Sequence, residues 1–264
     1  MLFLRSLVFQ IVFYLNFIAF ALAMPVMLLM PRAYAWHWAV YWMRSVLFWL
    51  RIIVGTTCEF RGLENVPEKG CILASKHQSA WETIAFGTVL DHLAFVMKQE
   101  LMAIPVFGWF AQKTGMIPIR RAERSRALGS MVEAAVVAVS KGSQIVIFME
   151  GTRMAAGTAR PYKAGVVRMA QKLGCPIVPI ALNSGLFWPR NKFMRYPGRV
   201  LVEFLPPMTL EDDIRKTLNE LEMAVEAASN ALILETARSD NPPPTIASAL
   251  AALKARGVDI TIAR

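Results

Sequence analysis

The longest hydrophobic run lies at the start of the chain. Residues 6–31 contain no charge, so this run is long enough to cross the hydrocarbon core of a bilayer. Residues 33–54 mix aromatic side chains with arginines, which is typical of the membrane interface. We predict two helices over residues 1–54, the first deeply inserted and the second nearer the interface; whether the first spans or re-enters stays open. Two soluble core helices are the alternative, but they would bury Arg44 and Arg51 without partners.

After Gly55 the pattern changes to short apolar runs that alternate with amphipathic stretches. Strands are predicted over residues 71–75, 93–97, 116–119, 144–149, 177–182 and 200–205, and helices over residues 80–90, 100–113, 125–140 and 161–173. Strands separated by helices of this length indicate the α/β class. We therefore predict a mixed, mainly parallel sheet covered by helices, preceded by an N-terminal two-helix membrane-binding hairpin.

A regular apolar stripe marks the C-terminal part of the chain. Thr209 is predicted to cap a long helix, whose apolar positions step by four and three residues and are Ile214, Leu218, Leu221, Val225, Ala228 and Leu232. We interpret the stripe as core packing. Asn241 and the three prolines after it end this helix, and the tail is predicted to hold a further short helix. The expected division is residues 1–54 for membrane-associated helices, 55–240 for the α/β domain and 241–264 for the tail.

The composition favours a membrane-bound protein. Hydrophobic residues make up 55% of the 264 residues, charged residues 18%, and the formal net charge is +10. This balance favours anionic lipid or a phosphorylated substrate as partner, and no motif for nucleic-acid binding supports that class. Cys58, Cys71 and Cys175 are predicted to be buried thiols in a reducing compartment. No metal or redox cofactor is expected, because the sequence has no metal-ligand spacing, dinucleotide loop or Walker loop.

The first candidate for chemistry is the pair His77 and Glu82. On a regular helix, a spacing of five residues would put these side chains about 140° apart. We therefore predict a strand that ends near Ser75, His77 in a loop, Ser79 as a helix N-cap, and Glu82 in the first turn, close to the imidazole. Such a pair suits a general base and its orienting carboxylate. The alternative is a surface loop with an ordinary helix-start glutamate.

The second candidate is the turn Glu150-Gly151-Thr152-Arg153, which follows a predicted strand. In α/β sheets, ligands gather beyond the carboxyl ends of the strands. Gly151 permits a tight turn, Thr152 offers a hydroxyl, and Arg153 offers a planar fork that suits phosphate. The alternative is a simple glycine turn with solvated charges.

Two further loops place cations after predicted strands. Lys98 starts the stretch Lys-Gln-Glu-Leu, and Arg120 and Arg121 follow Gly-Met-Ile-Pro-Ile. If these loops meet at one edge of the sheet, they form an electropositive cleft. A solvated basic face is the alternative for each of them.

These stretches, in this order and together with Val178-Pro179-Ile180-Ala181, resemble the glycerolphosphate acyltransferase superfamily, and within it the bacterial 1-acyl-sn-glycerol-3-phosphate acyltransferases. The resemblance covers about residues 55–210 and the N-terminal helices. The chain departs from the family at Glu82, where aspartate is usual, and at Met149, where proline is usual. Related lipid A acyltransferases also use glutamate at the first position.

The resemblance implies that His77 removes the proton of the free sn-2 hydroxyl of lysophosphatidic acid, which then attacks an acyl thioester, and that Glu82 holds Nδ1. Acyl-CoA or acyl carrier protein would be the donor. Arg153, Lys98 and Arg121 would bind the phosphate of the acceptor. Glu150, Gly151 and Thr152 would shape that pocket. The expected place is the bacterial inner membrane, with the site on the cytoplasmic side.

Two other functions stay open at this point. One is an acyltransferase for a different lyso-lipid acceptor, such as an ornithine-containing lipid or a lysophospholipid. The other is a lipid-binding membrane protein without catalysis, which the presence of His77, Glu82 and Arg153 disfavours.

Overall fold

The computed structural model describes residues 1–68, 70–119 and 124–261. They form a seven-stranded sheet in the order β1-β7-β6-β2-β5-β3-β4. The strands are β1 (Thr56–Arg61), β2 (Ile72–Ser75), β3 (Leu93–Lys98), β4 (Ile117–Ile119), β5 (Gln144–Phe148), β6 (Ile177–Leu182) and β7 (Gly198–Phe204). Every pairing is parallel except β6 with β7, which is antiparallel. The predicted mixed, mainly parallel sheet is therefore confirmed.

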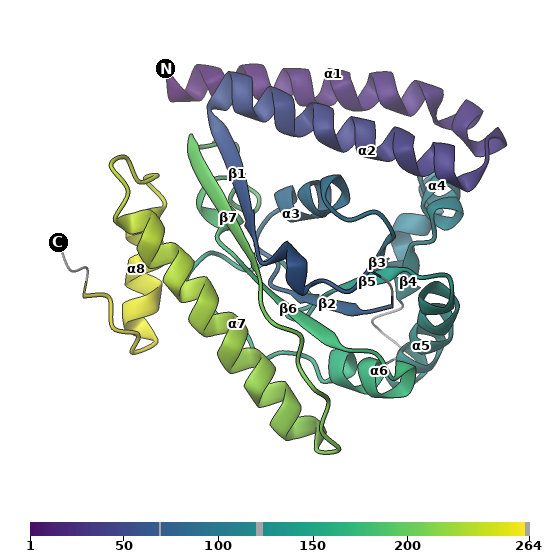
Figure 1. The fold of residues 1–264 in the computed structure, drawn as a ribbon. Coiled ribbons are helices and arrows are strands. Elements are labelled where there is room, and N and C mark those ends of the chain that lie inside the picture. Colours follow the sequence, from purple (N-terminus) through teal and green to yellow (C-terminus); the bar gives the residue numbers. More distant parts are fainter. Residues whose placement is uncertain (69, 120–123, 262–264) are drawn as a thin grey trace.

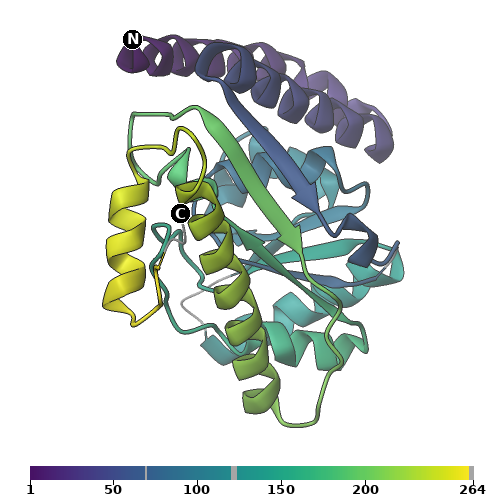
Figure 2. The same cartoon turned by 60° about the vertical axis from the view of Figure 1, so that its left-hand side comes forward.

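Helices cover both faces of the sheet (Figure 1). They are α3 (Trp81–Ala85), α4 (Phe107–Thr114), α5 (Arg124–Ser140), α6 (Gly165–Leu173), α7 (Ile214–Ala237) and α8 (Ile246–Ala255). Strand β2 shows how the faces divide, because Leu73 packs toward α3 while Ile72 and Ala74 pack toward α5 and α6. Figure 2 shows α7 crossing the sheet with α8 beside it. Strand β2, between β6 and β5, is buried on both faces.

The predicted N-terminal helix pair is present as α1 (Leu2–Leu29) and α2 (Arg32–Trp49), and α2 continues as a π-helical turn over Leu50–Val54. Helix α1 is long and apolar enough to cross a membrane. It lies along α2 on one side of the α/β domain (Figure 1). Its exposed face includes Leu4, Ile11, Leu15, Ile18 and Leu22.

Both ends of α1 contact the α/β domain. Near the start, the Ser6 hydroxyl accepts a hydrogen bond from the Arg195 backbone N–H at 3.0 Å, and the Phe9 ring packs edge-on against Trp188. Near the end, Lys113 Nζ donates to the Leu28 carbonyl at 2.6 Å. The helix therefore lies across the domain and is held at each end.

Several boundaries differ from the prediction. Strand β1 was not predicted; it is an edge strand with exposed Thr57 and Cys58, so it lacks an apolar pattern, and Cys58 is not the buried thiol we expected. Helix α3 is shorter than predicted and passes into a 3-10 turn over Phe86–Thr88. Helix α7 starts at Ile214 and not after Thr209, because the Asp213 carboxylate accepts the N–H groups of its first turn.

Helix α6 starts four residues later than predicted. Pro161 was expected at its first position, but the helix begins at Gly165. The intervening backbone is bonded elsewhere: Tyr162 N–H donates to Glu222 Oε2 at 3.2 Å, and Lys163 N–H donates to the Met149 carbonyl at 3.1 Å. These bonds hold the segment against α7 and the end of β5, and the helix begins only after it.

Candidate active site

The loop after β2 is built as a helix-capping motif. The Ser79 hydroxyl accepts the Trp81 N–H at 3.0 Å, and Glu82, three residues after Ser79, accepts the Ser79 N–H at 2.7 Å. This reciprocal pattern resembles a capping box. It is placed one residue early, because the N-cap position of α3 is Ala80 and not the predicted Ser79. It folds the start of α3 back over the end of β2, so the Glu82 carboxylate reaches the residues that precede its own helix.

The same carboxylate holds the His77 ring. Glu82 Oε1 lies 2.9 Å from His77 Nδ1 and also accepts the Gln78 N–H at 2.7 Å, while Oε2 accepts the Ser184 hydroxyl at 2.7 Å. Glu82 is fully buried. Because a carboxylate accepts hydrogen bonds, this contact places the ring proton on Nδ1 and leaves Nε2 as the basic nitrogen. The structure thus brings together the two residues predicted as base and orienting acid.

An aromatic surface supports the imidazole from one side. The His77 ring stacks on Phe148 with a centroid separation of 3.9 Å and an interplanar angle of 16°, and Phe148 in turn stacks near Phe95. The His77 side chain keeps 16% of its surface exposed. The ring is therefore held by packing and by a hydrogen bond, and part of its surface stays exposed.

The turn after β5 lies directly against the His77 loop. Glu150 Oε2 accepts the His77 backbone N–H at 3.0 Å, and the Met154 N–H donates to the His77 carbonyl at 2.7 Å. Gly151 has φ +68°, a conformation that suits glycine. Thr152 and Arg153 are half-buried. The turn predicted to bind phosphate is therefore joined to the backbone of His77 by the Glu150 side chain and by Met154, which directly follows the turn.

The predicted acceptor-binding residues occupy different environments. Glu150 is fully buried beneath the loop. Lys98 stands at the carboxyl end of β3, where its side chain is half exposed and lies 3.3 Å from Glu100. Arg121 lies outside the described residues. The Arg153 carbonyl accepts a hydrogen bond from Arg190 at 2.6 Å, which ties the turn to the loop after β6.

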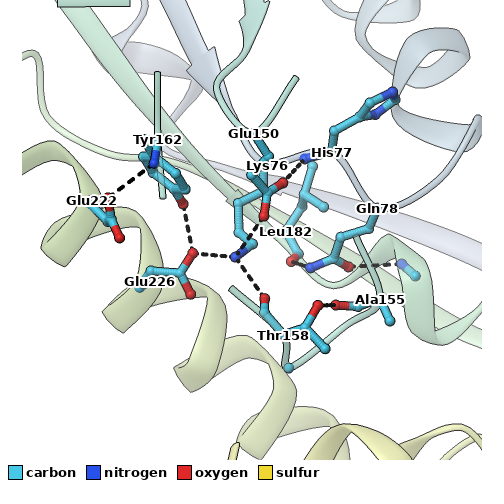
Figure 3. Close-up of polar contacts among 12 residues, drawn as sticks. Lys76, His77, Gln78, Glu150, Ala155, Thr158, Tyr162, Leu182, Glu222 and Glu226 are labelled. Atoms are coloured by element: carbon cyan, nitrogen blue, oxygen red, sulfur yellow. Dashed lines mark hydrogen bonds and ion pairs between the residues drawn. The ribbon is translucent and has the colours of Figure 1, made fainter. Parts of the chain in front are cut away.

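A buried group of charges that we did not predict lies behind this site (Figure 3). Lys76, only 1% exposed, forms an ion pair with Glu226 of α7, and its Nζ lies 3.5 Å from Glu150 Oε1. The Tyr162 hydroxyl donates to Glu226 at 2.8 Å, and Arg256 donates to the same carboxylate at 2.9 Å. The only signal in the sequence is a lysine directly between an apolar strand and His77.

Burial has the largest effect on the pKa of Glu150. Removal from water raises the pKa of its carboxyl above the ordinary value, whereas the Lys76 ammonium and the His77 N–H act in the opposite direction. Burial and the nearby Glu226 also raise the pKa of the Tyr162 hydroxyl, which therefore stays protonated and acts as a donor.

A cavity among the described residues lies away from this loop. It has a volume of about 720 Å³ and lies between α2 and the start of β3, with Arg32, His37, Arg44, His92 and Lys141 in its lining. None of the predicted site residues that the structure describes borders it. We therefore locate the candidate site by the contacts of His77 and not by cavity size.

Comparison with known proteins identifies the class. Residues 57–183 match the family model described as Acyltransferase. The fold agrees with a crystal structure from Thermotoga maritima titled as a 1-acyl-sn-glycerophosphate (LPA) acyltransferase, with a TM-score of 0.75 and 20% identity over 91% of this chain and 100% of that chain. The structural match shows the shared fold, and the family-model match indicates the acyltransferase class.

Sequence relatives narrow the class. The chain is 34% identical to the 1-acyl-sn-glycerol-3-phosphate acyltransferase of Pseudomonas aeruginosa over 211 residues, which are 78% of this chain and 82% of the relative. It is 30% identical to 1-acyl-sn-glycerol-3-phosphate acyltransferase alpha of Mus musculus over 64% of this chain and 61% of that relative. The chain therefore belongs to the 1-acyl-sn-glycerol-3-phosphate acyltransferase family, as its motifs indicated.

Proposed function

We propose that this protein transfers an acyl chain from an acyl thioester to the sn-2 hydroxyl of lysophosphatidic acid, with His77 as general base and Glu82 as its orienting carboxylate. The product is phosphatidic acid. The observation that carries the proposal is the 2.9 Å contact between the partly exposed His77 ring, at Nδ1, and Glu82 Oε1, in a chain whose relatives are named for this reaction.

The chemistry follows from the position of the pair. An alcohol is a weak nucleophile near neutral pH, so His77 Nε2 takes its proton as the oxygen attacks the thioester carbonyl. The imidazolium that forms is stabilised by the Glu82 carboxylate. When the tetrahedral intermediate collapses, the carbon–sulfur bond breaks and the leaving thiolate takes up, from the His77 imidazolium, the proton that came from the alcohol. The reaction leaves the ester, a free thiol and the enzyme in its starting state.

The cations near this loop are suited to hold the phosphate of the acceptor. Arg153 follows Thr152 in the turn that contacts His77 through Glu150 and Met154. In the proposed complex, Arg153, Lys98 and Arg121 bind the phosphate, and Gly151 and Thr152 shape the turn. Guanidinium and ammonium groups form charge-assisted hydrogen bonds with phosphate oxygens.

The N-terminal hairpin would bring this site to the lipid. Its exposed apolar face fits the outer part of a bilayer leaflet, while Arg44 and Arg51 lie exposed on the second helix and its continuation, suited to headgroups. The proposed place is the cytoplasmic face of the bacterial inner membrane. A lyso-lipid acceptor then needs no transfer through water.

Product identification tests the proposal. The purified full chain is incubated with lysophosphatidic acid and either acyl-CoA or acylated carrier protein, and lipid products are identified by mass spectrometry. Phosphatidic acid formation with one of these donors is the expected result. His77→Ala should make no product above background while the variant still binds vesicles and unfolds at the wild-type temperature. Full activity of His77→Ala, or an ester formed only on ornithine lipid or another lysophospholipid, contradicts the proposal.

Arg153→Ala tests the phosphate contact. Loss of a charge-assisted hydrogen bond of about 1.5–3 kcal/mol predicts a KM for lysophosphatidic acid raised about 10-fold or more, with kcat changed less. Arg160→Ala is the matched control, because Arg160 is exposed in the same loop region. Steady-state kinetics on vesicles measure both variants. A KM that is equal in the two variants excludes Arg153 from the phosphate site.

A further inference from the structure

A buried lysine precedes the proposed base. Lys76 is 1% exposed, and its ammonium lies between two carboxylates, Glu150 and Glu226 (Figure 3). Its Nζ also lies 3.4 Å from the Thr158 carbonyl. A lysine is rarely buried in this way unless its charge is compensated. The two carboxylates therefore account for the burial of Lys76, because they compensate its charge.

The charges in this group balance. Lys76 and Arg256 supply two positive charges, Glu150 and Glu226 supply two negative ones, and Tyr162 donates a further hydrogen bond to Glu226. A buried pair that loses one partner leaves an uncompensated charge, which is strongly unfavourable. Each member of the group is therefore held in place by the others.

The members come from distant parts of the chain. Lys76 follows β2, Glu150 follows β5, Glu226 lies on α7 and Arg256 follows α8. The region that matches the acyltransferase family model ends at residue 183. Glu226 and Arg256 thus join the His77 loop to a segment beyond that region.

The group reaches His77 through Glu150. Its Oε2 accepts the His77 backbone N–H, and its Oε1 has no hydrogen-bond partner among the described residues and faces Lys76 at 3.5 Å. The orientation of this carboxylate therefore depends on the lysine on one side. Through Oε2, the same carboxylate determines where the backbone of His77 lies.

We propose that Lys76 and Glu226 are positioning residues for acyl transfer: Glu226 holds Lys76, Lys76 orients Glu150, and Glu150 sets the place of the His77 loop. Neither residue touches substrate. This inference rests on the proposed role of His77 as general base. It makes the C-terminal helices part of the machinery that aligns the base with the bound acceptor, an alignment to which rate is sensitive.

A double-mutant cycle tests the path from Lys76 to Glu150. The full-length variants Lys76→Met, Glu150→Gln and the double variant are assayed on vesicles with lysophosphatidic acid and the donor that the wild type uses. If Lys76 acts through Glu150, Lys76→Met lowers kcat about 10-fold with little change in KM, and the double variant is no slower than the slower single variant. If the two substitutions act independently, the fall in kcat of the double variant should instead equal the product of the falls in the two single variants.

Glu226→Gln tests the next link and keeps the shape of the side chain. It should lower kcat several-fold, at a KM within about 2-fold of wild type, because the amide cannot balance the Lys76 charge. Glu235→Gln is the matched control, since Glu235 lies on the same helix but pairs with Arg61 at the surface. The control should keep wild-type kcat. Thermal unfolding of every variant reports folding, and if Lys76→Met does not fold, Glu226→Gln carries the test.

The outcomes separate this inference from the proposed function. Wild-type protein that forms no phosphatidic acid with any thioester contradicts the function itself. An active wild type combined with wild-type kcat in folded Glu226→Gln, or with multiplying effects in the cycle, overturns the positioning role and leaves the function in place.

Discussion

Two buried carboxylates flank His77, and they are held in opposite ways. Glu82 accepts four hydrogen bonds, three of them from residues within five positions along the chain. Glu150 accepts one backbone N–H, and its other oxygen faces a lysine that is itself paired with a distant helix. Both side chains are fully buried. One carboxylate is fixed by local hydrogen bonds and the other mainly by long-range charge.

The difference separates two tasks. The local motif fixes the ring of His77 relative to the start of α3, so it governs which nitrogen is basic. The long-range charges fix the backbone of the same residue relative to β5 and α7. We therefore expect changes at Glu82 to alter the proton-transfer step and changes at Glu150 to alter alignment and folding.

Among changes to the two carboxylates and their partners, the largest effect is expected for Glu82→Gln. The amide can still accept the backbone N–H groups, so the loop should keep its fold, but it no longer offers a negative charge to the imidazolium. Loss of that support to a general base predicts a fall in kcat of about 100-fold with an almost unchanged KM. Steady-state kinetics at saturating donor measure this change. A kcat within a few-fold of wild type would mean that the carboxylate only caps the helix.

A smaller effect is expected for Glu150→Gln. The amide oxygen still accepts the His77 N–H, but the attraction to Lys76 is lost, which predicts a fall in kcat of about 10-fold. The kcat values of Glu150→Gln and Glu82→Gln are measured under identical conditions and compared. If Glu150→Gln were the slower of the two, the backbone position would matter more than the charge beside the ring.

The difference in stability between the wild type and Glu150→Gln should depend on pH in a defined direction. Burial raises the pKa of Glu150 in the folded state, so the folded protein binds this proton more tightly than the unfolded chain does. The resulting stability is present below the ordinary pKa of 4.5 and is lost as the pH rises through the folded-state pKa. The melting temperature of wild type minus that of Glu150→Gln should therefore increase on acidification from neutral pH. A difference that is constant with pH would contradict the shift.

The smallest effect is expected for Ser184→Ala. The substitution removes one of four donors to Glu82, and the other three keep the carboxylate in place. We predict a loss of kcat of only about 2- to 5-fold together with a small decrease in melting temperature. Kinetics and thermal unfolding on one preparation measure both. A loss as large as that of Glu82→Gln would show that the local hydrogen bonds act as one unit.

Local patterns explain which parts of the site the sequence predicted. The capping box lies within four residues, Ser79 to Glu82, so its approach to His77 follows from helix geometry. The turn at Gly151 was also expected from its place after a strand. The sheet was predicted because its central strands are apolar on both faces.

Long-range contacts explain what was missed. Lys76 and Glu226 are 150 positions apart, and Ser184 and Glu82 are 102 positions apart, so no local pattern links them. The late start of α6 has the same origin, since Tyr162 bonds to Glu222 of α7. Strand β1 was missed because an edge strand with polar, exposed positions lacks the apolar pattern of its buried neighbours.

The attachment of α1 at both ends has a mechanical consequence. With Ser6 bonded at Arg195 and Leu28 bonded to Lys113, the hairpin is attached to the α/β domain at two separate points. In a bilayer, any tilt that curvature or lateral pressure imposes on the hairpin would rotate the imidazole through the same angle. In the proposed membrane-bound state, the depth of His77 relative to the headgroups would then change with the tilt of the hairpin.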